Sequence, residues 1–347
     1  MRAVPATEAL RPARPGPAVV TLAVAAWVAA SLAGLLLGPI DVPVRESIRA
    51  LVDAIPLVEV GHGLSETELR VLYEIRAPRV FMGSLVGAIL AVGGAAYQGV
   101  FRNPLADPYL LGVAAGAGLG ATIGFGVGVD ENLITILAFA GAIAAVAATY
   151  VLGRSMGNRT AAALILAGVA VSAFATALQT YLLQRNVETL RSVYTWVFGR
   201  LTTVGWGQVG GLVPYALLAV VLILIHRRSL DVLGVGDDEA AALGLNVDRV
   251  RWVVVLAATL ATAAAVSVSG LIGFVGIIVP HTVRLMTSWS YRVIVPLSII
   301  FGAAFLVAAD IVARTVAAPA ELPIGIVTAF VGAPFFLVVL RSVGRRA

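Results

Sequence analysis

Hydrophobic and polar positions are segregated over long distances along this chain. Apolar runs of about 20 residues, the length of a helix that crosses a bilayer, are separated by shorter polar segments. With one span assigned to each run, the pattern predicts ten transmembrane helices, at 18–37, 80–100, 109–129, 132–152, 161–183, 209–225, 250–269, 271–286, 294–313 and 324–340. The eighth run is short and contains Pro280, which predicts a break within that helix.

The largest charged feature of the second half of the chain is a polar island at 226–251. Within it, three consecutive acidic residues are followed by alanines, a leucine and Gly244. Acidic side chains favour the N-terminus of a helix, and glycine favours the left-handed position just after its end. We therefore predict a short helix of two or three turns over 236–246. The pattern alone leaves open whether this helix is a tight connector or a docking surface.

The composition places the chain in a membrane. Hydrophobic residues make up 60% of it and charged residues 12%, with a mean hydropathy of +0.97, whereas soluble domains are about 25% charged. All 24 basic residues are arginine, and the lack of lysine excludes a Walker A phosphate loop. Any ATP hydrolysis must therefore come from a partner. There is no cysteine, and His62, His226 and His281 are far apart, so we expect no bound metal or other cofactor.

The distribution of arginine predicts the orientation. Arginines are more frequent in the loops on the side of the N-terminus, which places that side in the cytoplasm. An even number of spans returns the C-terminus to the same side. We thus expect a cytoplasmic tail at 1–17, a single transmembrane domain at 18–347, and a cytoplasmic location for 226–251. This topology accounts for the net charge of +5 without a nucleic-acid partner.

Two outer segments are expected to carry structure of their own. Residues 39–78 are acidic and contain several prolines and glycines, and we predict a short amphipathic helix plus a loop there. Residues 184–207 contain Trp196 and Trp206, which suit a membrane interface. The centre of this second segment, 192–199, is a candidate for a short helix that dips into the membrane.

Glycines and one acidic residue are the informative positions inside the spans. A strip of glycines every four residues predicts close packing of the third span against a neighbour, at Gly112, Gly116, Gly120, Gly124 and Gly128. Gly83 and Gly87 predict the same for the second span. Asp310 lies towards the outer half of the ninth span, with Arg314 one turn later. A proton relay and a structural Asp–Arg pair are both possible roles for Asp310, and we favour the pair.

Several blocks of sequence resemble one transporter family. The first-half blocks are Arg76-Ala-Pro-Arg79, GAILAVGGAAYQ at 87–98, RNPLADP at 102–108 and LGVAAGA at 111–117. The second-half blocks are LGVG at 233–236, ALGL at 242–245, GLIGFVGIIVPHTVR at 270–284, ADIVAR at 309–314 and ELPIGIVTAFVGAPFF at 321–336. From about residue 75 onward, the chain resembles the permease subunit of the ABC importers that take up iron-siderophores, haem and cobalamin.

The resemblance implies an all-α, glycine-rich permease of ten transmembrane helices in the cytoplasmic membrane. Its partners would be a second permease subunit, two ATPase subunits that carry ATP and Mg²⁺, and an external substrate-binding protein. The expected substrate is a ferric chelate, either a siderophore or haem, and cobalamin is the alternative. A secondary transporter that uses Asp310 as a proton site is the competing hypothesis from a different class, and an intramembrane enzyme has no catalytic constellation to support it.

The resemblance also assigns roles to residues. Outer arginines that pair with the binding protein would be Arg76, Arg79 and Arg314, unless they only anchor the chain at the interface. A cytoplasmic gate would comprise Asn103, Pro104, Leu105, Thr160 and Ala161, although these positions suit ordinary helix–helix turns equally well. The translocation path would include Ser172, Thr176 and Gln179. Coupling to the ATPase would use Gly236, Asp237, Asp238, Glu239, Ala240, Ala241, Ala242, Leu243, Gly244 and Leu245. The segment 287–292 departs from the family pattern and keeps only its arginine, Arg292.

Overall fold

The computed structural model describes residues 15–56, 60–155, 161–201 and 205–344, and in these ranges the chain is all helix and loop, as the sequence predicts. Each predicted span contains a helix. These helices are α2 (Pro17–Leu36), α5 (Ala77–Phe101), α6 (Val113–Val127), α7 (Glu131–Ser155), α8 (Ala161–Arg185), α10 (Trp206–Leu233), α12 (Val247–Ser269), α13 (Val275–Met286), α14 (Tyr291–Thr315) and α15 (Ile324–Gly344).

Seven of the described helices are long and apolar enough to cross a membrane, and three apolar helices are shorter, at Val113–Val127, Val275–Met286 and Ile324–Val339. The predicted break at Pro280 is wrong, because α13 continues through this proline. The shortening lies at the other end, where residues 271–274 are not helical and Phe274 adopts a left-handed conformation with φ of 69°. The eighth span is thus short because its first turn is missing.

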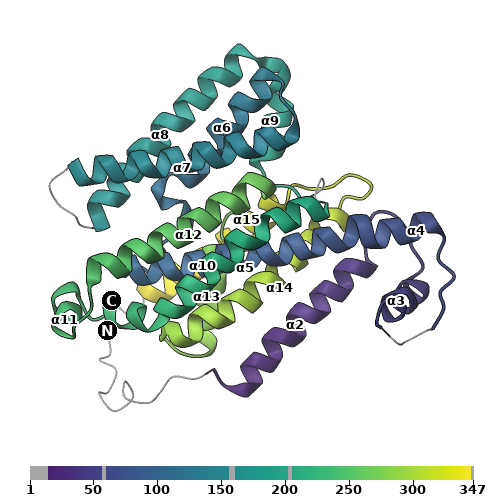
Figure 1. Cartoon of the computed structure of the whole chain (residues 1–347), viewed down its shortest axis with the longest axis horizontal. Helices are drawn as coiled ribbons and strands as arrows, with labels where there is room; N and C mark the ends of the chain where they lie inside the picture. The colour runs from purple at the N-terminus through teal and green to yellow at the C-terminus, as the bar shows by residue number, and fades with distance from the viewer. Residues whose placement is uncertain (1–14, 57–59, 156–160, 202–204, 345–347) are drawn as a thin grey trace.

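Helix α5 lies at the centre of the bundle and is buried along almost its whole length. It packs against α10, α12, α13 and α14, while α2 lies on the outside against α14 (Figure 1). Two glycines explain how these helices approach so closely. A Cβ at Gly87 would collide with the backbone of Gly302 in α14, and a Cβ at Gly94 would collide with the backbone of Gly276 in α13. Backbone-to-backbone packing therefore fixes the core of the bundle.

Helices α6, α7 and α8 form a second group that packs together and meets the rest mainly through α12 (Figure 1). The predicted glycine strip operates here, because a Cβ at Gly116 or Gly120 would strike backbone of α7 at Gly141 or Leu137. The strip is shorter than predicted. Gly112 and Gly128 lie outside α6 and cap its two ends with φ of 87° and 73°. Only the three internal glycines therefore form the packing face.

The two ends of the bundle carry different short elements. At one end lies α11 (Asp237–Ala242), between α10 and α12, and we call this the α11 end. At the opposite end lie α3 (Val44–Asp53) and α4 (Glu66–Arg70), and α4 continues through a π-helical turn at Val71–Arg76 into α5 (Figure 1). Helix α9 (Leu190–Val197) follows α8, and its Val193 and Trp196 are buried. The short helices predicted within 39–78 and near 192–199 are therefore confirmed.

Candidate functional site

The α11 helix has the local features that the sequence predicts, but it is shorter. It comprises six residues rather than two or three turns, with three acidic residues in its first turn. Gly244 has φ of +84°, the left-handed conformation expected just after the helix. Ala240 faces the protein and is fully buried, whereas Leu243 is 70% exposed and Val235 is 59% exposed. The tip of this end therefore presents apolar side chains to its surroundings.

Asp237 connects α11 to two other helices. Its Oδ1 accepts a hydrogen bond of 3.0 Å from Arg102 Nη2, and Arg251 Nη2 donates to both of its carboxylate oxygens at 3.0 Å. Arg102 is the C-cap of α5 and adopts a left-handed conformation, with φ of 51°. Arg251 lies in the first turns of α12. Movement of α11 would therefore act on the end of the central helix and on α12 through one carboxylate.

The loop after α5 contains the first part of the predicted gate. Asn103 and Pro104 are exposed and Leu105 is half-buried, and the Asn103 side chain accepts a hydrogen bond from the backbone N–H of Leu105. Because Arg102 directly precedes these residues, the loop is connected to α11 through Asp237. In the second part of the predicted gate, Thr160 lies outside the described residues, and Ala161 is described only as the first residue of α8.

Asp107 ends the same loop and is half-buried. It accepts a hydrogen bond from the backbone N–H of Tyr109 and so caps a short 3₁₀ helix, Pro108–Leu111. Burial raises the pKa of Asp107 to about 6, because few polar groups replace the water that an ionised carboxylate loses. The described residues place no cation within ion-pair distance of it, in contrast to Asp237.

The segment that departs from the family pattern makes its own contacts at the α11 end. Asp231, in the last turn of α10, accepts hydrogen bonds from Ser290 Oγ at 2.7 Å and from the Tyr291 backbone N–H at 2.6 Å. Arg292 Nε is 3.4 Å from the same carboxylate. These contacts fix the turn between α13 and α14 to α10. Sequence reasoning did not find them because the partners are about 60 residues apart.

The three predicted path residues lie on α8. Ser172 and Gln179 lie against Gly112 and Gly118, so both side chains turn towards the α6 side of their own group, and Thr176 is exposed. Another part of the α8 surface exposes large apolar side chains, with Phe174 71% exposed. The structure thus brings two of the three residues to an internal contact and leaves one at the surface.

The predicted docking arginines are buried at the α3 end, where each has partners within the chain. Arg79 forms ion pairs with Asp310 at 2.8 Å and with Glu321 at 2.9 Å. Arg76 donates to the backbone carbonyl oxygens of Leu35 and Leu36, at the end of α2. These two guanidinium groups therefore have internal partners that the family resemblance did not suggest.

Arg314 is the largest side chain that is fully buried in the described part of the chain. Its Nη2 donates to the carbonyl oxygen of Gly34 at 2.6 Å, and its Nε is 3.5 Å from Asp310. The expected Asp310–Arg314 pair is therefore present, but it is the minor contact of that carboxylate. Asp310 accepts three hydrogen bonds from Arg79. The i+4 spacing revealed the local neighbour and missed the stronger partner 231 residues away.

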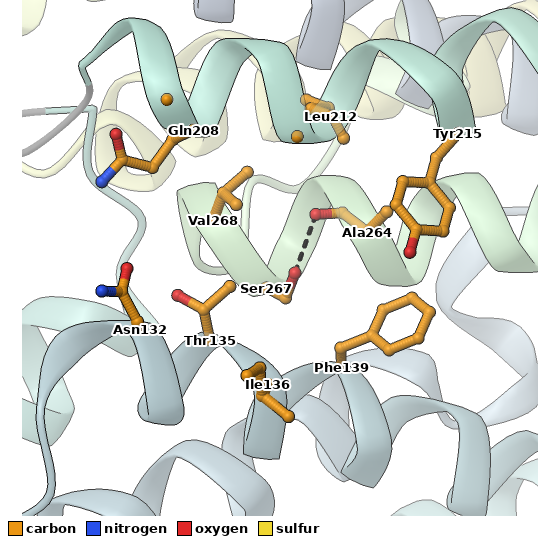
Figure 2. Close-up of a pocket in the computed structure, with 12 residues that line it drawn as sticks. Asn132, Thr135, Ile136, Phe139, Gln208, Leu212, Tyr215, Ala264, Ser267 and Val268 are labelled. Atoms are coloured by element: carbon orange, nitrogen blue, oxygen red, sulfur yellow. Dashed lines mark hydrogen bonds between the residues drawn. The ribbon is translucent and has the colours of Figure 1, made fainter.

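A cavity of about 430 Å³ lies between α7, α10 and α12 (Figure 2). Its polar side chains are neutral, namely Asn132, Thr135, Gln208, Ser267 and Tyr215. Figure 2 shows Ser267 bonded to the carbonyl oxygen of Ala264 in its own helix, at 2.9 Å. With no charged residue in its lining, this cavity offers no counter-charge to an anionic ligand. Among the described residues there is also no cluster of three or more histidine or acidic side chains that could hold a metal.

An all-helical bundle with multiple apolar spans is typical of a multi-pass membrane protein. Residues 25–342 match the model of the FecCD transport family, and the chain belongs to that family. It is a transport component rather than a catalytic enzyme.

Named relatives extend over most of the chain. The cobalamin import system permease protein BtuC of Halobacterium salinarum is 38% identical over 94% of this chain and 90% of its own length. The Fe(3+)-citrate import system permease protein YfmD of Bacillus subtilis is 37% identical over 87% of this chain and 90% of its own. The hemin transport system permease protein HmuU of Yersinia pestis is 37% identical over 79% and 84%.

A solved structure shares the fold. An inward-facing metal-chelate type ABC transporter superposes on this chain with a TM-score of 0.82 and 27% sequence identity. The match covers 94% of this chain and all of the other. The all-α permease fold expected from the sequence is therefore confirmed, and so is membership of the importer family that the sequence blocks resemble.

Proposed function

We propose that this chain forms the membrane path of an ABC importer for a metal chelate and that α11 is the lever through which a separate ATPase drives it. The observation that carries the proposal is the attachment of α11 to α5 and α12 through Asp237. An element that transmits work must make different contacts in two global states. A helix with an exposed apolar tip and an ionic attachment to two spans suits that role.

The proposed assembly follows from this role. Two copies of the chain would face each other, two ATPase subunits would bind at the α11 ends, and a substrate-binding protein would bind at the α3 ends. The α11 end would then lie in the cytoplasm together with both termini, in accordance with the arginine distribution. ATP and Mg²⁺ would be held by the ATPase subunits.

The proposed coupling runs from α11 to the loop after α5. When the ATPase subunits close, a shift of α11 would pull on Arg102 through Asp237 and so move Asn103, Pro104 and Leu105. Arg102 is strained towards a left-handed conformation that non-glycine residues seldom adopt. A small displacement there can therefore change the direction of the loop. The facing part of the gate would comprise Thr160 and Ala161, and Thr176, which is the exposed one of the three path candidates on α8, would line the path above it.

For the docking of the binding protein we keep Arg76, Arg79 and Arg314 as the candidate residues, with a condition that their burial imposes. Arginine suits bidentate recognition of carboxylates. These guanidinium groups would reach an external carboxylate only by exchanging internal partners. Arg76 is best placed to do so, because its partners are backbone carbonyl oxygens rather than acidic side chains.

A ferric chelate is the substrate that we propose first, because relatives of this chain are named for the import of ferric citrate, ferric hydroxamate and hemin. Cobalamin is the alternative, favoured by the 38% identity to the cobalamin permease of Halobacterium salinarum. The two are separated by measuring uptake of ferric citrate, hemin and cobalamin with the cognate binding protein. Accumulation of cobalamin alone would overturn the first choice.

ATP dependence tests the proposal itself. The chain should be reconstituted in vesicles with and without its ATPase, with ATP inside the vesicles or with a proton gradient alone. Uptake that requires both ATPase and ATP supports the lever, whereas uptake driven by the proton gradient without ATPase contradicts it and supports a secondary transporter. The structure favours the first result, because the Asp310 oxygens that a proton relay would need are engaged by Arg79.

A further inference from the structure

A crevice between α7, α8 and α12 is apolar along most of its length and charged at one end, as a phospholipid is. Its larger part is a cavity of about 510 Å³ with a lining that is almost entirely apolar, including Ile143, Val146, Val255 and Leu260. This volume lies within the range of about 300–1,000 Å³ that is usual for ligand cavities. Ala147 and Leu256 at its rim are exposed. The cavity therefore opens at the surface of membrane-spanning helices, where lipid tails are the surrounding medium.

A smaller cavity of about 180 Å³ continues the crevice towards the α11 end. Four residues line both cavities and so join them, namely Tyr150, Leu164, Arg251 and Trp252. The smaller cavity adds Arg154, from the last turn of α7, and Asp248. One continuous crevice thus has an apolar body within the bilayer and, at its end, a charged mouth lined by two arginines and one aspartate, as a lipid has tails and a headgroup.

At the mouth, a buried arginine N–H has no hydrogen-bond partner in the protein and can donate to a phosphate. Arg251 Nε is buried and has no hydrogen-bond partner, although Nη2 of the same side chain is engaged by Asp237. Asp248 is 4.0 Å from Arg251 Nη1, too far for a hydrogen bond. No ion pair of the described residues engages Arg154. The small cavity thus holds two guanidinium groups, one with a free buried donor, against the single carboxylate of Asp248, and an anion can accept hydrogen bonds from both arginines.

An aromatic pair marks the level of the membrane surface at the mouth. The rings of Tyr150 and Trp252 meet edge to face with centroids 4.2 Å apart. Tyrosine and tryptophan are enriched where acyl chains give way to headgroups, and basic pockets between helices on the cytoplasmic side bind anionic headgroups. We infer that this crevice binds an anionic phospholipid, with its phosphate at Arg154 and Arg251 and an acyl chain in the apolar cavity. This inference goes beyond the proposed function and does not depend on it.

The test measures lipid retention by the full-length protein in detergent. Phosphatidylglycerol and phosphatidylcholine with identical acyl chains are added, and bound lipid is counted by native mass spectrometry. We expect wild type to retain phosphatidylglycerol in preference. Arg154→Gln should lower its retention about fivefold, the effect of one basic residue on an anionic lipid. Ala147→Trp, which fills the apolar cavity, should abolish it.

Matched controls separate the site from the general surface. Arg249→Gln removes an exposed arginine at the same end of α12 outside the crevice, and Ala144→Trp adds a tryptophan to exposed surface of α7 outside the cavity. Both should retain phosphatidylglycerol like wild type. Unfolding temperatures confirm that each variant is folded. Equal retention of both lipids by wild type, or normal retention by Arg154→Gln and Ala147→Trp, overturns the site. A change in oligomeric state with Ala147→Trp and no loss of lipid also overturns it, because a second copy would then cover the crevice.

Discussion

The two ends of the molecule each contain a carboxylate held by two arginines, and the two networks differ in burial. At the α3 end, Asp310 is buried with Arg79 and Arg314, and its side chain is 3% exposed. At the α11 end, Asp237 is 43% exposed and binds Arg102, which is equally exposed, and Arg251, which is 11% exposed. The same chemistry therefore occurs once in the core and once at the surface.

Burial decides what each network can do. Separating a buried pair leaves a charge without water or a counter-charge and costs much free energy, whereas an exposed pair exchanges with water at little cost. The Asp310 network is therefore suited to holding α5 and α14 in one arrangement. The Asp237 network is suited to changing partners during a transport cycle. Position in the bundle, rather than residue type, separates a structural element from a candidate switch.

The largest expected effect comes from breaking the buried network. Asp310→Ala leaves Arg79 and Arg314 without their shared counter-charge, and loss of one member of a buried pair costs roughly 3–5 kcal/mol. We expect a clear fall in the unfolding temperature of the purified protein, measured by intrinsic fluorescence. Glu321→Gln is the control, because this partner of Arg79 is 25% exposed and its loss should have a smaller effect. Equal stability of Asp310→Ala and wild type would show that the network is not structural.

Disrupting the Asp237 network should reduce transport more than it reduces the stability of the fold. Asp237→Arg should lower ATP-driven uptake by at least about fivefold, the lower limit of usual coupling energies, because it repels Arg102 and Arg251. Its unfolding temperature should fall less than that of Asp310→Ala, since the exposed pair with Arg102 is worth about 0–1 kcal/mol and only Arg251 is largely buried. The double variant with Arg102→Asp restores one of the two pairs and should recover part of the uptake.

Asp238→Arg is the matched control for this experiment, because Asp238 is the exposed neighbour in the same helix turn and no ion pair of the described residues involves it. It should lower uptake less than Asp237→Arg does, because Asp238 lies on the proposed docking helix but the links from Asp237 to Arg102 and Arg251 stay intact. If Asp238→Arg and Asp237→Arg reduce uptake equally, the α11 surface matters through its charge and the link to Arg102 does not.

Arg76 lies between the two extremes, because it is buried but bound only to carbonyl oxygens. Arg76→Gln should weaken binding of the substrate-binding protein at low salt if this guanidinium group exchanges internal partners for an external carboxylate. The affinity is measured by titrating the binding protein over the immobilised permease. High salt should reduce the difference, since screening weakens such contacts. A variant with normal affinity and a lower unfolding temperature would assign Arg76 a purely structural role.

Local chemistry was predictable from the sequence, and long-range pairing was not. The acidic start of α11 and the left-handed Gly244 depend on neighbours within a few residues, so the pattern found them. The partner of Asp310 did not follow from the pattern, because Arg79 is on another helix and the i+4 rule pointed to Arg314. Likewise, the link from Asp237 to Arg102 spans 135 residues. Apolar periodicity locates spans but carries no information about which polar groups meet between them.

A periodic sequence pattern also continues past the ends of a helix, so it does not show where the helix begins or ends. The four-residue spacing of glycines includes Gly112 and Gly128, which cap α6 rather than pack within it. The same residue type serves close approach at Gly116 and positive φ at Gly112, and spacing cannot separate these two roles. In the eighth span, Pro280 led to the prediction of a break. The helix instead continues through Pro280 and begins only at Val275, after the predicted start of the span. Both differences concern boundaries, where local sequence and tertiary packing compete.

The last prediction concerns Asp107, a third kind of carboxylate, which is half-buried and has no ion-pair partner among the described residues. Its pKa of about 6 lies above the usual value of about 3.9, so the folded protein binds this proton more tightly than the unfolded chain. Stability should therefore be highest below about pH 4, fall as the pH rises to about 6, and stay level above it. Asp107→Asn keeps an acceptor for the Tyr109 N–H and should remove this part of the pH dependence of the unfolding temperature. Asp238→Asn, at an exposed site, should retain it. An unchanged pH profile in Asp107→Asn would show that this carboxylate does not titrate with a raised pKa in the folded protein.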